Sequence, residues 1–158
     1  MRSLFRLLAI TALMSMSLTS ASFAGTAKAT KSIAKMHRVA IQVDQNDAAI
    51  MNLALNNATN IFEYYLKKGE AVEVNIVTYG PGLHMLRVDT SPVQDRIKHL
   101  KDLAFPSKIQ LSACNNTKEG MEKKEGHEIA ILPEATIVPS GVVRLMELQE
   151  KGWSYVRP

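Results

Sequence analysis

The chain has 158 residues with a formal net charge of +4, and 46% of its residues are hydrophobic, which is typical of a globular protein with one core. No basic stripe interleaved with aromatic residues and no phosphate-binding or dinucleotide fingerprint occurs, so we expect neither a nucleic-acid partner nor a cofactor. The single cysteine rules out an intramolecular disulfide, and four scattered histidines predict no metal site.

Residues 1–24 have the pattern of an export signal. Two arginines precede an apolar stretch over residues 7–18, which is too short to span a membrane, and Ser22-Phe-Ala24 is a small-x-small cleavage site. We expect cleavage after Ala24, which gives a periplasmic or secreted protein without a membrane anchor. The alternatives are cleavage a few residues away and retention as an uncleaved anchor.

The mature chain is expected to have a flexible leader over residues 25–36 and one domain over residues 37–158. A β-branched run at residues 37–43 predicts a central strand. Asp44-Gln-Asn46 then offers caps for an amphipathic helix from about Asp47 to Lys68.

Residues 71–78 predict a second strand, and the segment Tyr79-Gly-Pro-Gly82 that follows predicts a tight turn. A short helix at residues 83–86 and a longer one at residues 93–103 come next. The apolar run at residues 108–113 predicts the third strand.

Cys114 stands where this third strand gives way to a helix that ends near Gly126. Residues 128–132 fit either a short strand or a loop. A final strand at residues 135–138 and a helix over residues 140–151, capped by Ser140 and stopped by Gly152, complete the domain.

Strands that alternate with helices predict an α/β fold, a three-layer sandwich with a mostly parallel central sheet. Ligands bind such sheets beyond the carboxyl ends of the strands. Four segments follow strand ends and are therefore expected to share one edge: Asp44-Gln-Asn46, Tyr79-Gly-Pro-Gly82, Cys114-Asn115 and Pro139-Ser-Gly141.

Cys114 is the strongest candidate for chemistry at this edge. A helix N-terminus favours the thiolate form, which is the reactive form of cysteine. The alternative is that Cys114 is a small buried hydrophobic residue without a chemical role.

Several separated motifs resemble the DsrE/DsrF-like family. They are Tyr79-Gly-Pro-Gly-Leu-His84, Ala113-Cys-Asn-Asn-Thr117, Val138-Pro-Ser-Gly-Val-Val143 and the ending Gly152-Trp-Ser-Tyr155. The resemblance implies a compact α/β domain with a flavodoxin-like arrangement, frequent homo-oligomers, and a cysteine that carries sulfur as a persulfide between proteins. The family cysteine corresponds to Cys114.

The resemblance thus suggests a sulfur carrier or sulfurtransferase that works through a Cys114 persulfide, with protein or small-molecule sulfur donors and acceptors. Asn115, Asn116 and Thr117 would present hydrogen-bond donors near the sulfur, and His84 would donate or accept a proton. Further candidates for ligand binding, which helix caps and turns also explain, are Asp44, Asn46, Gly80, Gly82, Ser140 and Gly141.

Two other functions fit the same residues. In one, the protein is a small-ligand-binding or oligomeric scaffold protein and Cys114 is structural. In the other, a disulfide between the Cys114 residues of two subunits serves as a redox sensor. An accessible thiol would argue against the scaffold protein, and a dimer that survives denaturant but not reductant would favour the sensor.

Overall fold

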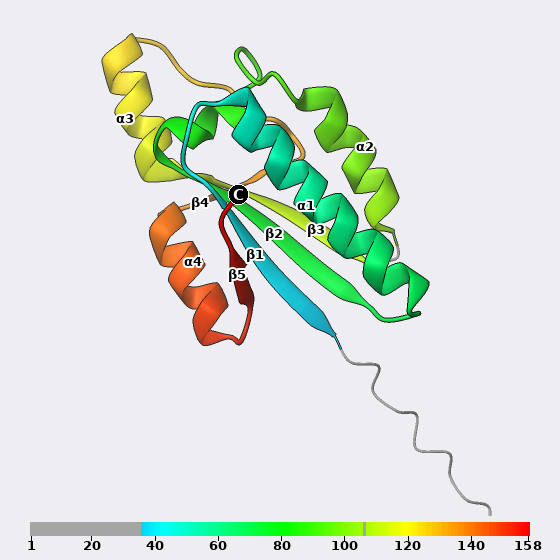
Figure 1. Cartoon of the computed structure of the whole chain (residues 1–158). Helices are drawn as coiled ribbons and strands as arrows, with labels where there is room; N and C mark the ends of the chain where they lie inside the picture. The colour runs from blue at the N-terminus through cyan, green and yellow to red at the C-terminus, as the bar shows by residue number, and fades with distance from the viewer. Residues whose placement is uncertain (1–35, 106) are drawn as a thin grey trace, which may run out of the picture. The chain divides into compact units, whose positions relative to one another are not determined.

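The computed structural model describes residues 36–105 and 107–158. The expected export signal, its cleavage site and the leader up to residue 35 lie outside these ranges. The described part is an α/β domain with a five-stranded parallel sheet in the order β4-β3-β2-β1-β5 (Figure 1). Its elements are β1 (His37–Val43), α1 (Ala48–Lys67), β2 (Val72–Thr78), the 3₁₀ helix η1 (Gly80–Leu86), α2 (Gln94–Ala104), β3 (Lys108–Cys114), α3 (Asn115–Glu125), β4 (Thr136–Val138), α4 (Gly141–Glu150) and β5 (Ser154–Val156).

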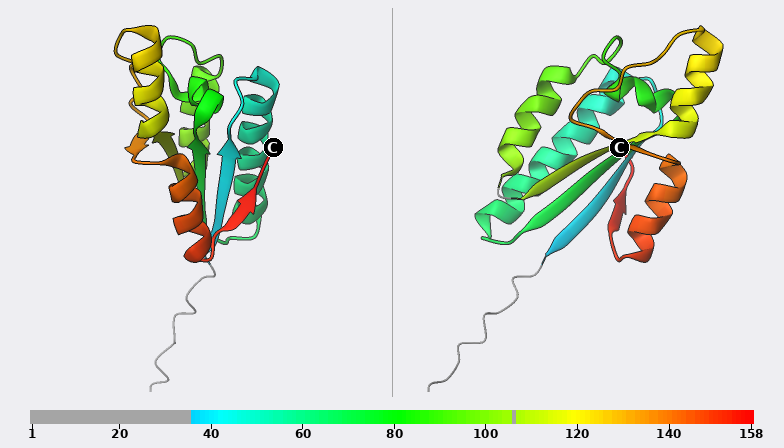
Figure 2. Two further views of the ribbon diagram at one scale, coloured as in Figure 1. Left: turned by 90° about the vertical axis from the view of Figure 1, so that its left-hand side faces the viewer. Right: turned by 180° about the vertical axis from the view of Figure 1, so that it is seen from behind.

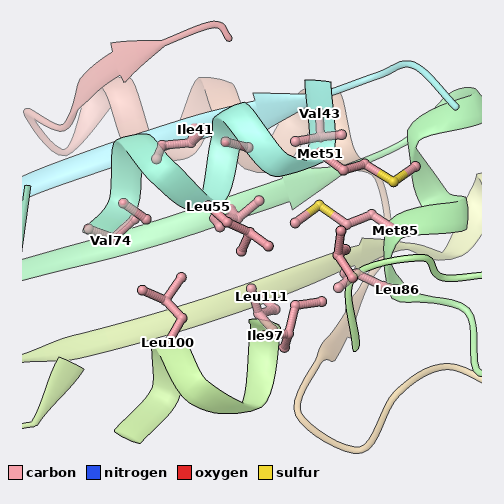
Figure 3. Close-up of a cluster of buried hydrophobic side chains, with 14 of the residues drawn as sticks. Ile41, Val43, Met51, Leu55, Val74, Met85, Leu86, Ile97, Leu100 and Leu111 are labelled. Atoms are coloured by element: carbon pink, nitrogen blue, oxygen red, sulfur yellow. The ribbon is translucent and has the colours of Figure 1, made fainter. Parts of the chain in front are cut away.

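Successive side chains of each strand point to opposite faces of the sheet, and helices cover both faces. Ile41, Val74 and Leu111 face α1 and α2 and form the larger core with Leu55 and Ile97 (Figure 3). The residues between them face the other way, where α4 packs on Ala40 and Val77 through Leu145 and Leu148. Figure 2 shows α4 on the side of the sheet away from α1 and α2. This is the three-layer α/β arrangement that the sequence predicts.

The long helix begins one residue later than expected and has a different cap. The Asp47 carboxylate accepts hydrogen bonds from the backbone N–H groups of Ala49, at 2.6 Å, and Ile50. Neither Asp44 nor Asn46 caps the helix, so the prediction that this segment supplies the cap is wrong. The Asp44 carboxylate is therefore free for other contacts at the sheet edge.

The C-terminal segment also differs from the prediction. Residues 135–138 were expected to form the final strand, but β5 follows α4 and pairs with β1 in parallel. With three residues, β5 is too short to show an alternating pattern in the sequence. Residues 128–132, left open between strand and loop, form a single antiparallel bridge between Ile131 and Arg87.

Among the residues that the structure describes, no helix is both long and apolar enough to cross a membrane.

Candidate functional site

All five strands are parallel, so their carboxyl ends lie at one edge of the sheet. Cys114, the last residue of β3, is paired with Val138, the last residue of β4. The chain enters α3 directly after Cys114 and enters α4 at Gly141, three residues after Val138. The first turns of both helices therefore lie beside the Cys114 side chain, as the expectation of a shared edge requires.

The Cys114 sulfur lies where these two helix N-termini meet. Burial of the sulfur opposes ionisation, but hydrogen bonds from the Thr117 hydroxyl and from the backbone N–H groups of Gly141, Thr117 and Asn116 outweigh it. The pKa of the Cys114 thiol is consequently lower than that of an ordinary cysteine. Groups from α3 and α4 together favour the thiolate, which increases the thiolate fraction of Cys114.

The sulfur is covered, yet it is not part of the apolar core. Cys114 is 4% exposed but belongs to neither cluster of buried hydrophobic residues. Of the residues around it, Asn116 and Pro139 are exposed and Thr117 is half-buried, whereas Gly141 is buried. The sulfur therefore lies just beneath the surface at the edge of the sheet.

Thr117 links α3 to the glycine loop. Its hydroxyl oxygen accepts a hydrogen bond of 2.9 Å from the Gly80 backbone N–H, which leaves the hydroxyl proton for the Cys114 sulfur. Gly80 adopts a left-handed conformation with φ +51°. Two of the predicted site residues, Gly80 and Thr117, are thus in direct contact. Asn115 instead donates from its side-chain amide to Glu119 on the next turn.

Gly141 and Gly82 are required by close packing at this edge. A Cβ atom on Gly141 would lie 2.7 Å from Cβ of Tyr79, so the absent side chain lets α4 begin directly against the Tyr79 ring. A Cβ atom on Gly82 would overlap the carbonyl group of Val43. Both glycines therefore bring backbone segments together at the site.

Asp44 belongs to a polar cluster next to Tyr79. Its carboxylate accepts hydrogen bonds from Gln42 at 2.9 Å and from Arg157 at 3.1 Å, and the Tyr155 hydroxyl donates to Gln42 at 2.6 Å. Burial and the negative charge of Asp44 raise the pKa of the Tyr79 phenol. This cluster fastens the C-terminal segment to β1.

The remaining predicted site residues lie apart from the sulfur. The His84 ring nitrogen Nδ1 is 2.8 Å from the Thr90 hydroxyl, which is the hydrogen-bond partner of this ring. Asn46 is exposed on the loop before α1. Ser140 occupies the N-cap position of α4, but its side chain makes no capping hydrogen bond, contrary to the prediction.

The sequence places Tyr79 at this edge as the first residue of the segment Tyr79-Gly-Pro-Gly82, but it does not indicate that the Tyr79 side chain packs on Gly141. A second side chain, Arg87, has no sequence signal. Arg87 is 2% exposed and binds both Asp89 and Glu125. No sequence pattern connects Arg87 with Glu125, because 38 positions separate them. Within the described ranges, no three His, Cys, Asp or Glu side chains are grouped to hold a metal ion.

The arrangement can hold a thiolate and support its attack on an electrophilic sulfur. Neutral donors at two helix N-termini stabilise negative charge on whichever sulfur is bonded to the Cys114 side chain. Among the described residues, no side chain near Cys114 is placed to act as a general base for its thiol. The thiol is therefore activated by the groups at the two helix N-termini.

Comparison with known proteins identifies the family to which this fold belongs. No curated protein matches the chain, but among solved structures a protein of unknown function from Methanobacterium thermoautotrophicum, MTH1491, is similar with a TM-score of 0.62 and 27% identity. The similarity covers 77% of this chain and 99% of MTH1491. The profile of the DsrE/DsrF-like family matches residues 37–158, which is the entire α/β domain, and the chain therefore belongs to the DsrE/DsrF-like family.

Proposed function

We propose that this protein is a sulfur carrier that holds sulfane sulfur as a persulfide on Cys114. The observation that supports this most strongly is the position of Cys114 at the carboxyl end of β3, beside the first turns of α3 and α4, where neighbouring groups lower the pKa of its thiol. Membership of a family linked to sulfur relay adds to it. We also propose that the mature protein works outside the cytoplasm, on the basis of the signal pattern in residues 1–24.

Loading requires no external oxidant. The Cys114 thiolate attacks the outer sulfur of a donor R–S–SH, an S–S bond forms to Cys114, and the S–S bond of the donor breaks. The donor sulfur leaves as R–S⁻ with the electron pair of that bond, and the proton of the attacked sulfur stays on the new persulfide. One sulfur atom has moved with no net change in oxidation state.

Unloading uses the same hydrogen bonds. An acceptor thiolate attacks the outer sulfur of the Cys114 persulfide, and Cys114 departs as a thiolate. A leaving thiol with a lower pKa departs faster, so the donors that lower the pKa of Cys114 also favour delivery. A carrier needs both properties because it must take sulfur up and release it.

The test is the intact mass of the purified protein before and after incubation with a small-molecule polysulfide. We expect a gain of one sulfur atom that cyanide removes, and no gain in Cys114→Ser. Thr117→Ser serves as the matched control because it keeps the hydroxyl beside the sulfur. A wild-type protein that gains no sulfur, although the thiol reacts with an alkylating reagent in the native state, would disprove the proposal.

The burial of Cys114 favours one competing function, a binding or scaffold protein with a structural cysteine. Cys114 is 4% exposed, and buried thiols often act only as small hydrophobic groups. Under this alternative the thiol resists alkylation until the protein is denatured, and its persulfide does not form. The same two measurements therefore separate the two functions.

A further inference from the structure

Helix α3 is attached to the domain almost without apolar burial. None of its residues is buried, whereas α1, α2 and α4 each bury several apolar side chains. Only Met121 packs against the core, and it does so partly. Tertiary packing of an apolar face normally fixes a helix in place, so the orientation of α3 depends on its polar contacts.

Arg87 makes the strongest of these contacts, at the end of α3 away from Cys114. Its nitrogens Nη1 and Nη2 donate to the two carboxylate oxygens of Glu125 at 2.7 and 2.8 Å. Its Nε and Nη2 donate to Asp89 at 2.9 and 2.6 Å. Paired bonds between a guanidinium and a carboxylate fix direction as well as distance.

Arg87 is itself held rigidly by the body of the domain. It follows η1, in which Met85 and Leu86 are fully buried. On both sides of Arg87 the backbone is bonded to residues 130–132, through Val88 N–H to Ala130 and Leu132 N–H to Leu86. The guanidinium is therefore a fixed point to which Glu125 ties the last turn of α3.

The first turn of α3 carries the groups that act on the sulfur. Asn116 and Thr117 follow Cys114 directly and help to lower the pKa of its thiol, and Thr117 accepts a hydrogen bond from Gly80. An α-helix of this length is a rod of about 16 Å, so freedom at one end becomes tilt at the other. Hydrogen bonds weaken steeply with misalignment, and those to the sulfur would be affected first.

We propose that Arg87 is a positioning residue for Cys114. Through Glu125 it holds α3 in the orientation in which the first turn of the helix faces the sulfur. This inference rests on the proposed function only in taking Cys114 as the reactive group. It does not require that the protein transfers sulfur.

Two conservative variants separate positioning from general stability. Glu125→Gln weakens the contact between Arg87 and α3. Asp89→Asn also removes one carboxylate charge that pairs with the Arg87 guanidinium, but Asp89 lies outside α3. Both keep His127, whose ring nitrogen Nε2 lies 3.4 Å from the Glu125 carboxylate. The rate of Cys114 alkylation by iodoacetamide, followed across a pH series, measures the thiolate fraction.

We expect Glu125→Gln to move the midpoint of the alkylation profile to higher pH and to slow the reaction at neutral pH by about threefold. Asp89→Asn should keep the wild-type midpoint. A second variant, Arg87→Lys, keeps the charge but cannot bind two carboxylates side by side, and it should move the midpoint in the same direction as Glu125→Gln.

The inference is wrong if Glu125→Gln and Arg87→Lys fold, as judged by far-UV circular dichroism, and keep the wild-type midpoint. It is equally wrong if Asp89→Asn moves the midpoint as far as Glu125→Gln. If the midpoints move as expected but polysulfide adds no sulfur to the wild-type protein, the sulfur-carrier proposal fails and the positioning role of Arg87 stands.

Discussion

The Thr117 hydroxyl joins the loop after β2 to the first turn of α3, because it accepts a 2.9 Å hydrogen bond from the Gly80 N–H. The same hydroxyl helps to lower the pKa of the Cys114 thiol. A single side chain therefore fixes the loop that follows one strand against the helix that follows its neighbour. Gly80 and Thr117 come from different motifs of the chain, and the sulfur lies between the elements that carry them.

Replacing Thr117 tests this link. Thr117→Val keeps the shape of the side chain, removes a donor to the sulfur and leaves the Gly80 N–H without its partner. We expect a higher pKa for Cys114, slower alkylation at neutral pH and a loss of about 1 kcal/mol in the free energy of unfolding. Urea unfolding and the pH profile of alkylation measure the two effects.

Thr117→Ser is the control, since it retains the hydroxyl and should behave as the wild type in the alkylation profile. Equal alkylation profiles for the valine and serine variants would show that the hydroxyl does not stabilise the thiolate.

Gly141 gives a second prediction, because the start of α4 has no room for a side chain. Gly141→Ala places a methyl group against Tyr79, and we expect a loss of about 1 to 3 kcal/mol in the free energy of unfolding. The matched control is Gly120→Ala within α3, where a Cβ would have nothing within 4 Å. That change should stabilise the protein by about 0.5 to 1 kcal/mol through helix propensity. Thermal unfolding of the two variants measures both changes. If both variants changed the free energy of unfolding in the same direction, the packing argument would be contradicted.

Much of the fold could be predicted from periodicity, because long elements repeat their pattern. The strand at residues 37–43 and the helix after Cys114 both appear as expected. The strand Ser154–Val156 could not be found, since its three residues show no alternation and its place beside β1 is decided by how α4 crosses the sheet.

Only those features of the candidate site that follow from the parallel topology could be predicted from the sequence. Parallel strands bring Cys114, Gly80 and Gly141 to one edge, and strand ends are visible in the sequence. Which groups touch the sulfur depends on loop conformation, so the ring of His84 lies against Thr90 while the backbone of Gly141 reaches Cys114. The Arg87 contact with Glu125 could not be predicted either, because its partners lie far apart in the chain.

The cap of α1 gives a third prediction. Asp47→Ala removes the acceptor for the N–H groups of Ala49 and Ile50, and we expect a loss of about 1 kcal/mol in the free energy of unfolding. Asn46→Ala, one position earlier on the exposed loop, should change this free energy by less than about 0.5 kcal/mol. Chemical denaturation measures both changes. If the two variants lost equal free energy of unfolding, Asp47 would not be the cap of α1.

Acid should weaken the contact between Arg87 and its carboxylates. Hydrogen bonding to Arg87 lowers the pKa of Asp89 from 3.8 to about 2, and it also lowers the pKa of Glu125. Carboxyl groups whose pKa falls on folding stabilise the native state fully above their unfolded pKa. That stabilisation is lost as the pH falls through the folded pKa, so for Asp89 the loss runs from about pH 4 to about pH 2.

The measurement is urea unfolding at pH 7 and at pH 3, for the wild type and for Asp89→Asn. The variant has no carboxyl group at position 89 to protonate, so its free energy of unfolding should fall less between the two pH values than that of the wild type. Because the Asp89 side chain is 47% exposed, water and salt screen the ion pair, and added salt should reduce the difference between the two proteins. An equal loss in both proteins at low salt would mean that the acid sensitivity comes from other carboxyl groups, and that the contact between Asp89 and Arg87 does not stabilise the fold.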